Sequence, residues 1–423
     1  MGIFKKKNTT PDKEVASQSN AEVTTDSHEM FVLGLTAYKN GDFVTAKSWW
    51  ERAAELGNSD AMNNLGVIAK DAGDLKGAKS WYVRAADAGN SDAMFNLGFD
   101  AEEAGDLKGE KNWYERAAEL GNTGAMLNLA ELAHKAGDLK GAKSWWERAA
   151  EAGNSDAMFS LGQMAHEGGD LKSKGKSWYE RAAEAGSSGA MFELGSICEQ
   201  ETNDLKGTKS WYERAAEAGS SQAMDRLGYL AEDDGDLEEA IKWYTDAADC
   251  QNEYAMWSLG LIAIGSGELE DAKDWWEQAA DRGVSRAAFA SGFMAHQLGD
   301  EEEAERWFQR WRDEGSDDLS EMVEEVAEYS IEFAVFCLEF AADEGNSSYS
   351  LFDMGEFFET YAKDLKTAKS WYERAAAAGD SEAMRRLGFM ADEAGDLKST
   401  KSWFERAAEL GHSDAIRELK KLK

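Results

Sequence analysis

Apolar residues recur along the chain with the spacing of amphipathic helices. One segment carries four of them at positions i, i+3, i+7 and i+10, namely Leu75, Ala78, Tyr82 and Ala85. This spacing places all four on one face of a helix. Asp74 precedes the segment and can cap its first turn, whereas Gly89 follows it and can take the left-handed conformation that ends a helix. Ser91 is then expected to cap the next helix.

A second kind of segment alternates with the first. In residues 59–72, the residues expected on the buried face are Met62, Leu65 and Ala69. Gly66 stands in the middle of this segment, where glycine costs about 1 kcal/mol relative to alanine. Glycine returns at the equivalent position of most later segments, which indicates a packing requirement. We expect Gly66 and Ala78 to form the small pair that lets the two helices approach closely.

The two segments form one repeat. Glycines that mark its ends stand 32 residues apart at Gly41, Gly73, Gly105, Gly137 and Gly169. The single proline, Pro11, lies before the first repeat, so proline breaks no helix interior. One helix pair cannot bury its aromatic face alone, but stacked neighbours can. The pattern predicts an all-α protein, an α-solenoid of about twelve antiparallel helix pairs over residues 28–411, followed by a capping helix at 412–423.

Tryptophan is placed as regularly as glycine. Of the 16 tryptophans, 14 occupy a paired aromatic position in the second helix of a repeat, as Trp49 and Trp50 do. Aromatic pairs can bind quaternary ammonium groups or carbohydrate. The regular placement on the expected core side favours a structural role instead.

The charge balance narrows the classes of partner. The chain has 46 Lys and Arg residues against 82 Asp and Glu residues, a net charge of −36. Such a polyanion repels nucleic acid and anionic lipid. Residues 1–27 read as a polar, disordered tail, and no apolar run is long enough for a signal peptide or a membrane span. Three widely separated cysteines favour a reducing compartment or indifference to redox conditions, and we expect a cytoplasmic protein.

The repeat resembles that of a known family. Its marks are Leu97-Gly98, the pair Trp113-Tyr114, and Arg116-Ala117-Ala118 followed by Gly121. In these positions the sequence resembles the Sel-one-like repeat, a branch of the tetratricopeptide-type helical solenoids. Similar marks extend over residues 28–423. The resemblance implies a helical solenoid; the repeats here have 32 residues where tetratricopeptide repeats have 34.

No arrangement of residues predicts catalysis, a cofactor or a metal. The closest match to a phosphate loop, GGDLKSKGKS, has five residues between Gly169 and Gly175 where that loop needs four. We read its extra residue as an insertion in a turn. His134, His166 and His296 occupy one equivalent place in their repeats, and we expect them on the surface rather than on zinc. The cysteines are expected to be buried and inert. We therefore predict a protein that is not an enzyme.

Recognition is expected where the repeats differ. A stripe at residues 63, 67 and 70 lies beside the buried positions, and its equivalents vary from repeat to repeat. In tetratricopeptide-like solenoids the first helix of each repeat lines the concave face, so the resemblance implies that this stripe lines a groove. The aromatic residues predicted to bind a partner there are Phe31, Phe95, Phe99, Phe159, Phe192, Tyr229, Trp257, Phe289, Phe293, Phe352 and Phe389.

Acidic residues border the aromatic stripe, among them Glu102, Glu199 and Glu232. An aromatic trough with an acidic rim suits a protein or peptide that carries apolar anchors and basic side chains. In the alternative interpretation the same rings are enclosed between neighbouring repeats and serve stability alone.

Residues 317–344 depart from the repeat, because the tryptophan position holds Cys337 and acidic residues crowd one helix. The segment is either a drifted repeat or a hinge or private binding surface. For the whole chain, the first hypothesis is a non-enzymatic scaffold or adaptor that holds another polypeptide. The alternatives are a self-assembling structural protein and a hydrolase acting on cell-wall-like substrates. The sequence leaves the oligomeric state open.

Overall fold

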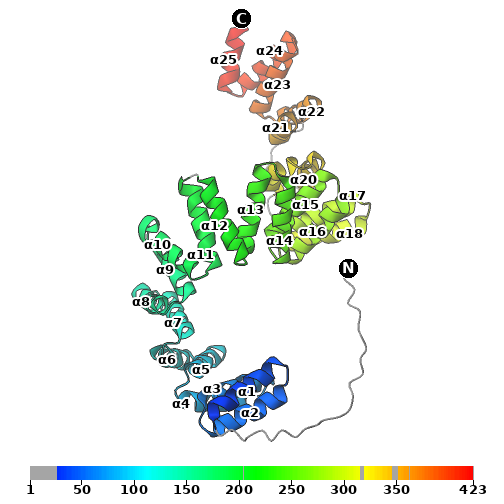
Figure 1. Cartoon of the computed structure of the whole chain (residues 1–423). Coiled ribbons are helices and arrows are strands. Elements are labelled where there is room, and N and C mark those ends of the chain that lie inside the picture. The colour runs from blue at the N-terminus through cyan, green and yellow to red at the C-terminus, as the bar shows by residue number, and fades with distance from the viewer. Residues whose placement is uncertain (1–25, 203, 315–318, 345–350, 362, 423) are drawn as a thin grey trace. The chain divides into compact units, whose positions relative to one another are not determined.

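The computed structural model describes residues 26–202, 204–314, 319–344, 351–361 and 363–422, apart from some side chains within these ranges. Of the predicted tail, residues 1–25 lie outside the described part. The described residues form an all-α solenoid of 25 α-helices in consecutive antiparallel pairs (Figure 1), as the sequence predicts. None of the described helices combines the length and the apolar character needed to cross a membrane.

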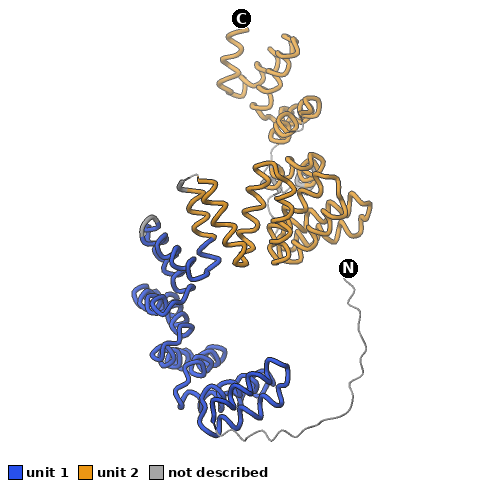
Figure 2. The backbone as a smooth tube through the Cα atoms, viewed as in Figure 1, with its two compact units in different colours: residues 1–191 blue, residues 192–423 orange. Residues whose placement is uncertain are grey.

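The chain divides into two compact units, residues 1–191 and 192–423 (Figure 2). The helices that begin in unit 1 are α1 (Ser27–Lys39), α2 (Phe43–Glu55), α3 (Ser59–Asp71), α4 (Leu75–Asp87), α5 (Ser91–Glu103), α6 (Leu107–Glu119), α7 (Thr123–Lys135), α8 (Leu139–Glu151), α9 (Ser155–Glu167), α10 (Lys176–Glu184) and α11 (Ser188–Ile197). A π-helical turn, Leu171–Gly175, precedes α10. The extra residue of GGDLKSKGKS is therefore absorbed into a helix start.

Unit 2 continues the pairing. Its helices are α12 (Leu205–Glu217), α13 (Ser221–Asp233), α14 (Leu237–Asp249), α15 (Glu253–Ser266), α16 (Leu269–Asp281), α17 (Ser285–Gln297), α18 (Glu301–Asp313), α19 (Leu319–Ala327), α20 (Ile331–Glu344), α21 (Leu351–Thr360), α22 (Leu365–Ala377), α23 (Ser381–Glu393), α24 (Leu397–Glu409) and α25 (Ser413–Lys421). A second π-helical turn, Cys198–Thr202, follows α11.

The helix ends follow the predicted signals with one correction. The carboxylate of Asp74 accepts a hydrogen bond of 2.9 Å from the backbone amide of Gly77, and Gly89 has a φ of 87°. The next helix is capped by Asn90, whose side chain accepts from the amide of Ala93 at 2.7 Å. The prediction of Ser91 as the cap was wrong by one residue, because Ser91 is already the first helical residue.

The recurring helix glycine makes room for an aromatic ring. A Cβ atom on Gly66 would lie 2.4 Å from the ring of Tyr82, which is buried. The predicted packing requirement is confirmed, but the group that needs the space is this ring rather than Ala78. The same arrangement occurs at Gly34, Gly98, Gly162, Gly195, Gly228, Gly260, Gly292, Gly355 and Gly388.

The paired aromatic residues have two different environments. The second member of each pair is buried, as Trp50 and Trp276 are. In most repeats the first member is half-buried under the guanidinium of an arginine three residues later, and the Arg84 carbon lies 4.2 Å from the centre of the Trp81 ring. Trp243 and Trp275 lack this arginine, because Asp246 and Gln278 occupy its position. Both members thus contribute to packing, since a cation over an indole face is attractive.

Candidate functional site

The structure divides the eleven predicted groove residues into three groups by exposure. Phe99 and Tyr229 are exposed, at 43% and 49% of their surface. Six are half-buried, namely Phe31, Phe95, Phe159, Phe192, Phe352 and Phe389. Three are buried, namely Trp257, Phe289 and Phe293.

The half-buried rings pack within and between repeats. The Phe95 ring centre lies 5.6 Å from that of Tyr114, and a Cβ on Gly124 of the next repeat would lie 3.2 Å from the Phe95 ring. Phe159 contacts Tyr179 in the same way, at 5.7 Å between ring centres. These positions therefore support repeat stacking, as the alternative interpretation states, while part of each ring still reaches the surface.

The three buried rings are not accessible to a partner, contrary to the expectation for them. Phe289 and Phe293 lie under α20, where the Phe333 ring centre is 4.4 Å from that of Phe293. The indole Nε1 of Trp257 donates a hydrogen bond of 2.8 Å to Glu325 of α19. The expectation fails at these positions because the chain covers this part of the face with its own helices.

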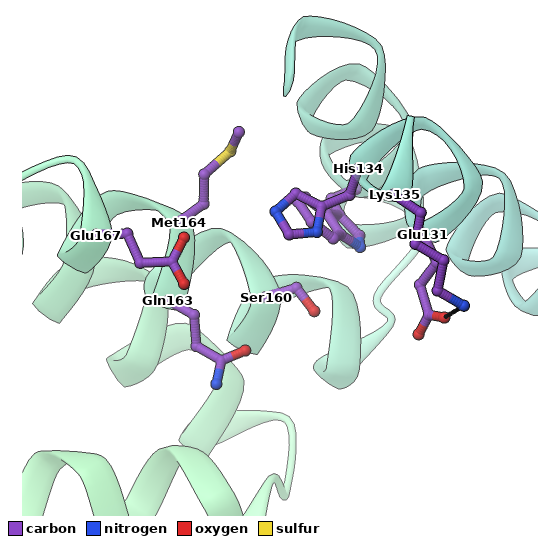
Figure 3. Close-up of a pocket in the computed structure, with 8 residues that line it drawn as sticks. Glu131, His134, Lys135, Ser160, Gln163, Met164 and Glu167 are labelled. Atoms are coloured by element: carbon purple, nitrogen blue, oxygen red, sulfur yellow. Dashed lines mark ion pairs between the residues drawn. The ribbon is translucent and has the colours of Figure 1, made fainter. Parts of the chain in front are cut away.

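A cavity of about 230 Å³ opens on the corresponding face of unit 1, between α7 and α9 (Figure 3). Its lining residues are Glu131, His134, Lys135, Trp146, Ser160, Gln163, Met164 and Glu167. Residues of the two helices face each other across it, with His134 on one side and Glu167 on the other (Figure 3). The ring centre of His134 lies 5.7 Å from that of Trp146, so the cavity has an aromatic wall.

We use the name "unit-1 face" for the surface that carries this cavity and the predicted stripe on α5, α7 and α9. Its members are Phe95, Phe99, Leu127, Glu131, Phe159 and Gln163, together with the lining residues of the cavity. Sequence reasoning placed Glu131 and Gln163 on the stripe but missed Ser160 and Met164. The signal available was the run of polar residues at equivalent positions of two adjacent repeats.

The unit-1 face is acidic but not uniformly so. In the cavity, Glu131 pairs with Lys135 of the same helix at 3.7 Å. Between α3 and α5, the ammonium group of Lys70 contacts Asp100 at 2.7 Å and lies 4.8 Å from the centre of the Phe99 ring. The Glu131–Lys135 pair is exposed, and exposed ion pairs contribute little to stability. It therefore leaves the Glu131 carboxylate able to exchange partners with an incoming cation.

Side chains that could hold a metal do not come together in the part of the chain that the structure describes. This part holds no cluster of three or more metal-ligating side chains. His134, His166 and His296 are exposed, as expected. Cys337 is buried, as predicted, and this burial raises the pKa of its thiol well above the usual value. Cys250 is exposed, so the expectation of burial was wrong for that cysteine.

Asp225 of α13 stands where most repeats carry an aromatic residue. Burial raises the pKa of its carboxyl to about 6, and Glu253 adds to this effect while Arg226 opposes it. The ordinary pKa of an aspartate is about 3.9. Folding therefore disfavours the ionised form, so this group lowers stability increasingly as the pH rises from about 4 to 6 and by a constant amount above that range.

Asp225→Asn is therefore expected to stabilise unit 2 at pH 8 by at most about 3 kcal/mol, since each pKa unit corresponds to about 1.4 kcal/mol. About half of this gain should remain at pH 5. Urea unfolding of both proteins at the two pH values measures it. A gain that is equal at both values, or a loss at pH 8, would show that Asp225 is ionised without penalty.

Comparison with known families assigns the repeats. The tetratricopeptide repeat family matches residues 31–93, 127–190, 221–251 and 258–318, more than half of the chain. The Sel1 repeat family matches residues 91–122, 188–220, 348–380 and 381–412. The chain belongs to the tetratricopeptide and Sel1-like repeat proteins. No curated protein matches its sequence.

Solved structures of repeat proteins resemble this one. One is a protective antigen of uropathogenic Escherichia coli strains with an SLR fold. The two sequences are 23% identical, and the match covers 94% of this chain and 87% of the antigen with a TM-score of 0.49. Another is a Sel1 repeat protein from Oxalobacter formigenes. The two sequences are 26% identical, and the match covers 53% of this chain and 99% of the Oxalobacter protein with a TM-score of 0.46.

Proposed function

We propose that this repeat protein is a non-catalytic interaction scaffold whose unit-1 face binds a polypeptide segment with basic side chains and apolar anchors. Folds built from tetratricopeptide and Sel1 repeats are typical of protein-interaction scaffolds. The observation that carries the proposal is the cavity between α7 and α9, lined by Glu131 and Glu167, on the same face as the exposed ring of Phe99.

Each part of the unit-1 face matches one part of such a ligand. An exposed aromatic ring offers a contact for an apolar side chain. The carboxylates of Glu131 and Glu167, which line the cavity, attract a lysine or arginine. The net charge of −36 raises the association rate of a basic segment at low salt.

The test is selection of random peptides on the immobilised full-length protein. We expect enriched peptides to combine Lys or Arg with Leu, Phe or Trp, and to bind more weakly as salt rises from about 0.05 to 0.3 M. Charge reversal at the cavity, Glu131→Lys with Glu167→Lys, should weaken the enriched peptides about tenfold or more.

A matched control carries the same change in net charge on the second helices, at the exposed residues Glu151 of α8 and Glu184 of α10. Glu151→Lys with Glu184→Lys should leave peptide affinity within about twofold, because these positions lie away from the cavity. Equal weakening by both double variants would show that only the overall charge matters. Enrichment of acidic peptides would contradict the proposal.

A further inference from the structure

The helix pair α19–α20 lies across α13, α15 and α17, each of which is the first helix of a repeat in unit 2. Repeats of a solenoid normally contact only their neighbours. Here Glu325 accepts a hydrogen bond from Trp257, 68 residues earlier, and Tyr329 donates one to Glu232, 97 residues earlier. The pair therefore spans α13 and α15, and Phe333 of α20 also reaches Trp276 of α16 at 5.4 Å between ring centres. Residues 319–344 thus fold back over earlier repeats.

The fold-back uses an apolar stripe of α20. Phe333, Phe336 and Phe340 are spaced i, i+3 and i+7, so they share one face of this helix. Their ring centres lie 4.4 Å from Phe293, 5.0 Å from Phe293 and 5.1 Å from Phe289, respectively. Phe289 and Phe293 are the two stripe positions of α17. A helix of this protein therefore docks, through its aromatic residues, on stripe positions that vary between repeats.

Charge pairing holds the edge of this contact. Glu325 of α19 pairs with Arg286 of α17 at 3.0 Å, and the Arg286 guanidinium lies 4.4 Å from the centre of the Trp257 ring. The incoming helix pair is acidic, and the receiving face supplies the arginine. Docking on unit 2 thus combines aromatic packing with the pairing of opposite charges. Hydrophobic grooves bind amphipathic helices through the same combination.

The unit-1 face repeats this arrangement with the charges reversed. Phe95 and Phe99 of α5 occupy the same stripe positions as Phe289 and Phe293, but Phe99 remains exposed. The carboxylates of Glu131 and Glu167 line the cavity of this face, so the face favours a cation from its ligand. A second copy of α19–α20 would bring acidic residues to acidic residues, which is unfavourable.

We propose that the unit-1 face docks a basic amphipathic helix of a partner protein, in the manner in which α20 docks within unit 2. This inference rests on the proposed function and specifies the conformation of the ligand. Apolar residues at i, i+3 and i+7 of that helix contact Phe95 and Phe99. Its Lys or Arg residues enter the cavity between Glu131 and Glu167.

The probe is a synthetic peptide with the sequence of Ile331–Glu344 in which the four acidic residues are replaced by lysine and Cys337 by serine. A second peptide carries the same charge and two internal prolines, which prevent a helix. Fluorescence anisotropy with the full-length protein should show at least about tenfold tighter binding of the first peptide. Circular dichroism should show that it becomes more helical on binding.

Two variants locate the contact. Phe99→Ala should weaken the helical peptide about fivefold to tenfold, whereas Leu107→Ala, a truncation of an exposed apolar residue on α6, should change its affinity less than about twofold. Both residues are exposed, so both variants should keep the wild-type melting temperature.

The outcomes separate this inference from the proposed function. If the proline peptide binds as tightly as the helical one, and Glu131→Lys with Glu167→Lys weakens both, the helical mode is overturned while the scaffold function stands. If Phe99→Ala leaves the affinity of the helical peptide unchanged, the contact assigned to Phe99 is overturned. If neither peptide binds although random selection yields basic ligands, the analogy with α20 fails.

Discussion

Gly162→Ala is expected to destabilise unit 1 by about 2 kcal/mol or more, within the usual range for overpacking a core. Alanine is the better helix former by about 1 kcal/mol, so helix propensity alone predicts the opposite sign. The added Cβ would lie 2.5 Å from the ring of Tyr179, which is buried between helices. A ring enclosed in this way can move only by separating α9 from α10. Urea unfolding monitored by circular dichroism measures the loss.

A matched control lies on α8 of the same unit. The Cβ of Gly141→Ala would meet only the carboxylate of Asp138, at 2.3 Å. That side chain is an exposed cap and can shift, as it does in α22, where Thr367 occupies the equivalent position and Asp364 still accepts from its amide at 3.1 Å. Gly141→Ala should therefore be neutral or stabilise by up to about 1 kcal/mol. Similar effects of the two substitutions would refute the explanation by ring packing.

One repeat shows how the fold accommodates a methyl group at this position. In α7 the glycine is replaced by Ala130, and the ring it faces belongs to Trp146. That ring is 7% exposed, against 2% for Trp50 and 0% for Trp276, which face glycines. The Trp146 ring also forms a wall of the unit-1 cavity. The exception to the packing rule thus coincides with the site that we propose to bind a partner.

The sequence predicts the repeats well because the forces that define them act over short distances. Asp74 and Gly89 determine helix ends through contacts within a few residues. The glycine that faces Tyr82, Gly66, can be recognised in the sequence because glycine recurs at this position of the repeat. Such signals need no knowledge of the folded chain. The family, the helix pairs and most helix ends were therefore accessible from the sequence.

The fold-back of α19–α20 was not predicted, because its contacts join residues 68 and 97 positions apart. A partial signal existed in α15, where Trp257, Leu261 and Ile264 make the stripe apolar at every position. A helix that is apolar on all sides is a buried helix. Applied to α15 and α17, this rule indicates an extra covering element, and it separates their rings from the exposed Phe99.

The candidate cavity could be predicted only in part. The stripe placed Glu131 and Gln163 on one face, because equivalent positions of adjacent repeats lie side by side. The hollow itself depends on the position of Trp146 and on the space between α7 and α9, which is set by packing rather than by residue type. The polar residues that line the cavity can therefore be predicted from equivalent positions of the repeats, whereas the volume of the cavity cannot.

Phe333→Ala is expected to destabilise unit 2 by about 3–5 kcal/mol, the usual cost of removing a buried phenylalanine ring. The ring is fully buried and contacts Trp276, Phe289 and Phe293, so its loss leaves a cavity at the centre of the fold-back. Because the pair α19–α20 covers α15 and α17, we expect Phe333→Ala to speed amide hydrogen exchange in these two helices and to lower the urea midpoint.

The control for Phe333→Ala is Ile331→Ala on the same helix. Ile331 is 37% exposed, so its truncation should cost less than about 1 kcal/mol and leave exchange in α15 and α17 unchanged. The comparison also tests the origin of the closed face in unit 2. If Phe333→Ala lowered stability but left exchange in α17 as slow as in the wild type, α20 would not be what covers Phe289 and Phe293. Some other part of the chain would then have to make those two rings inaccessible.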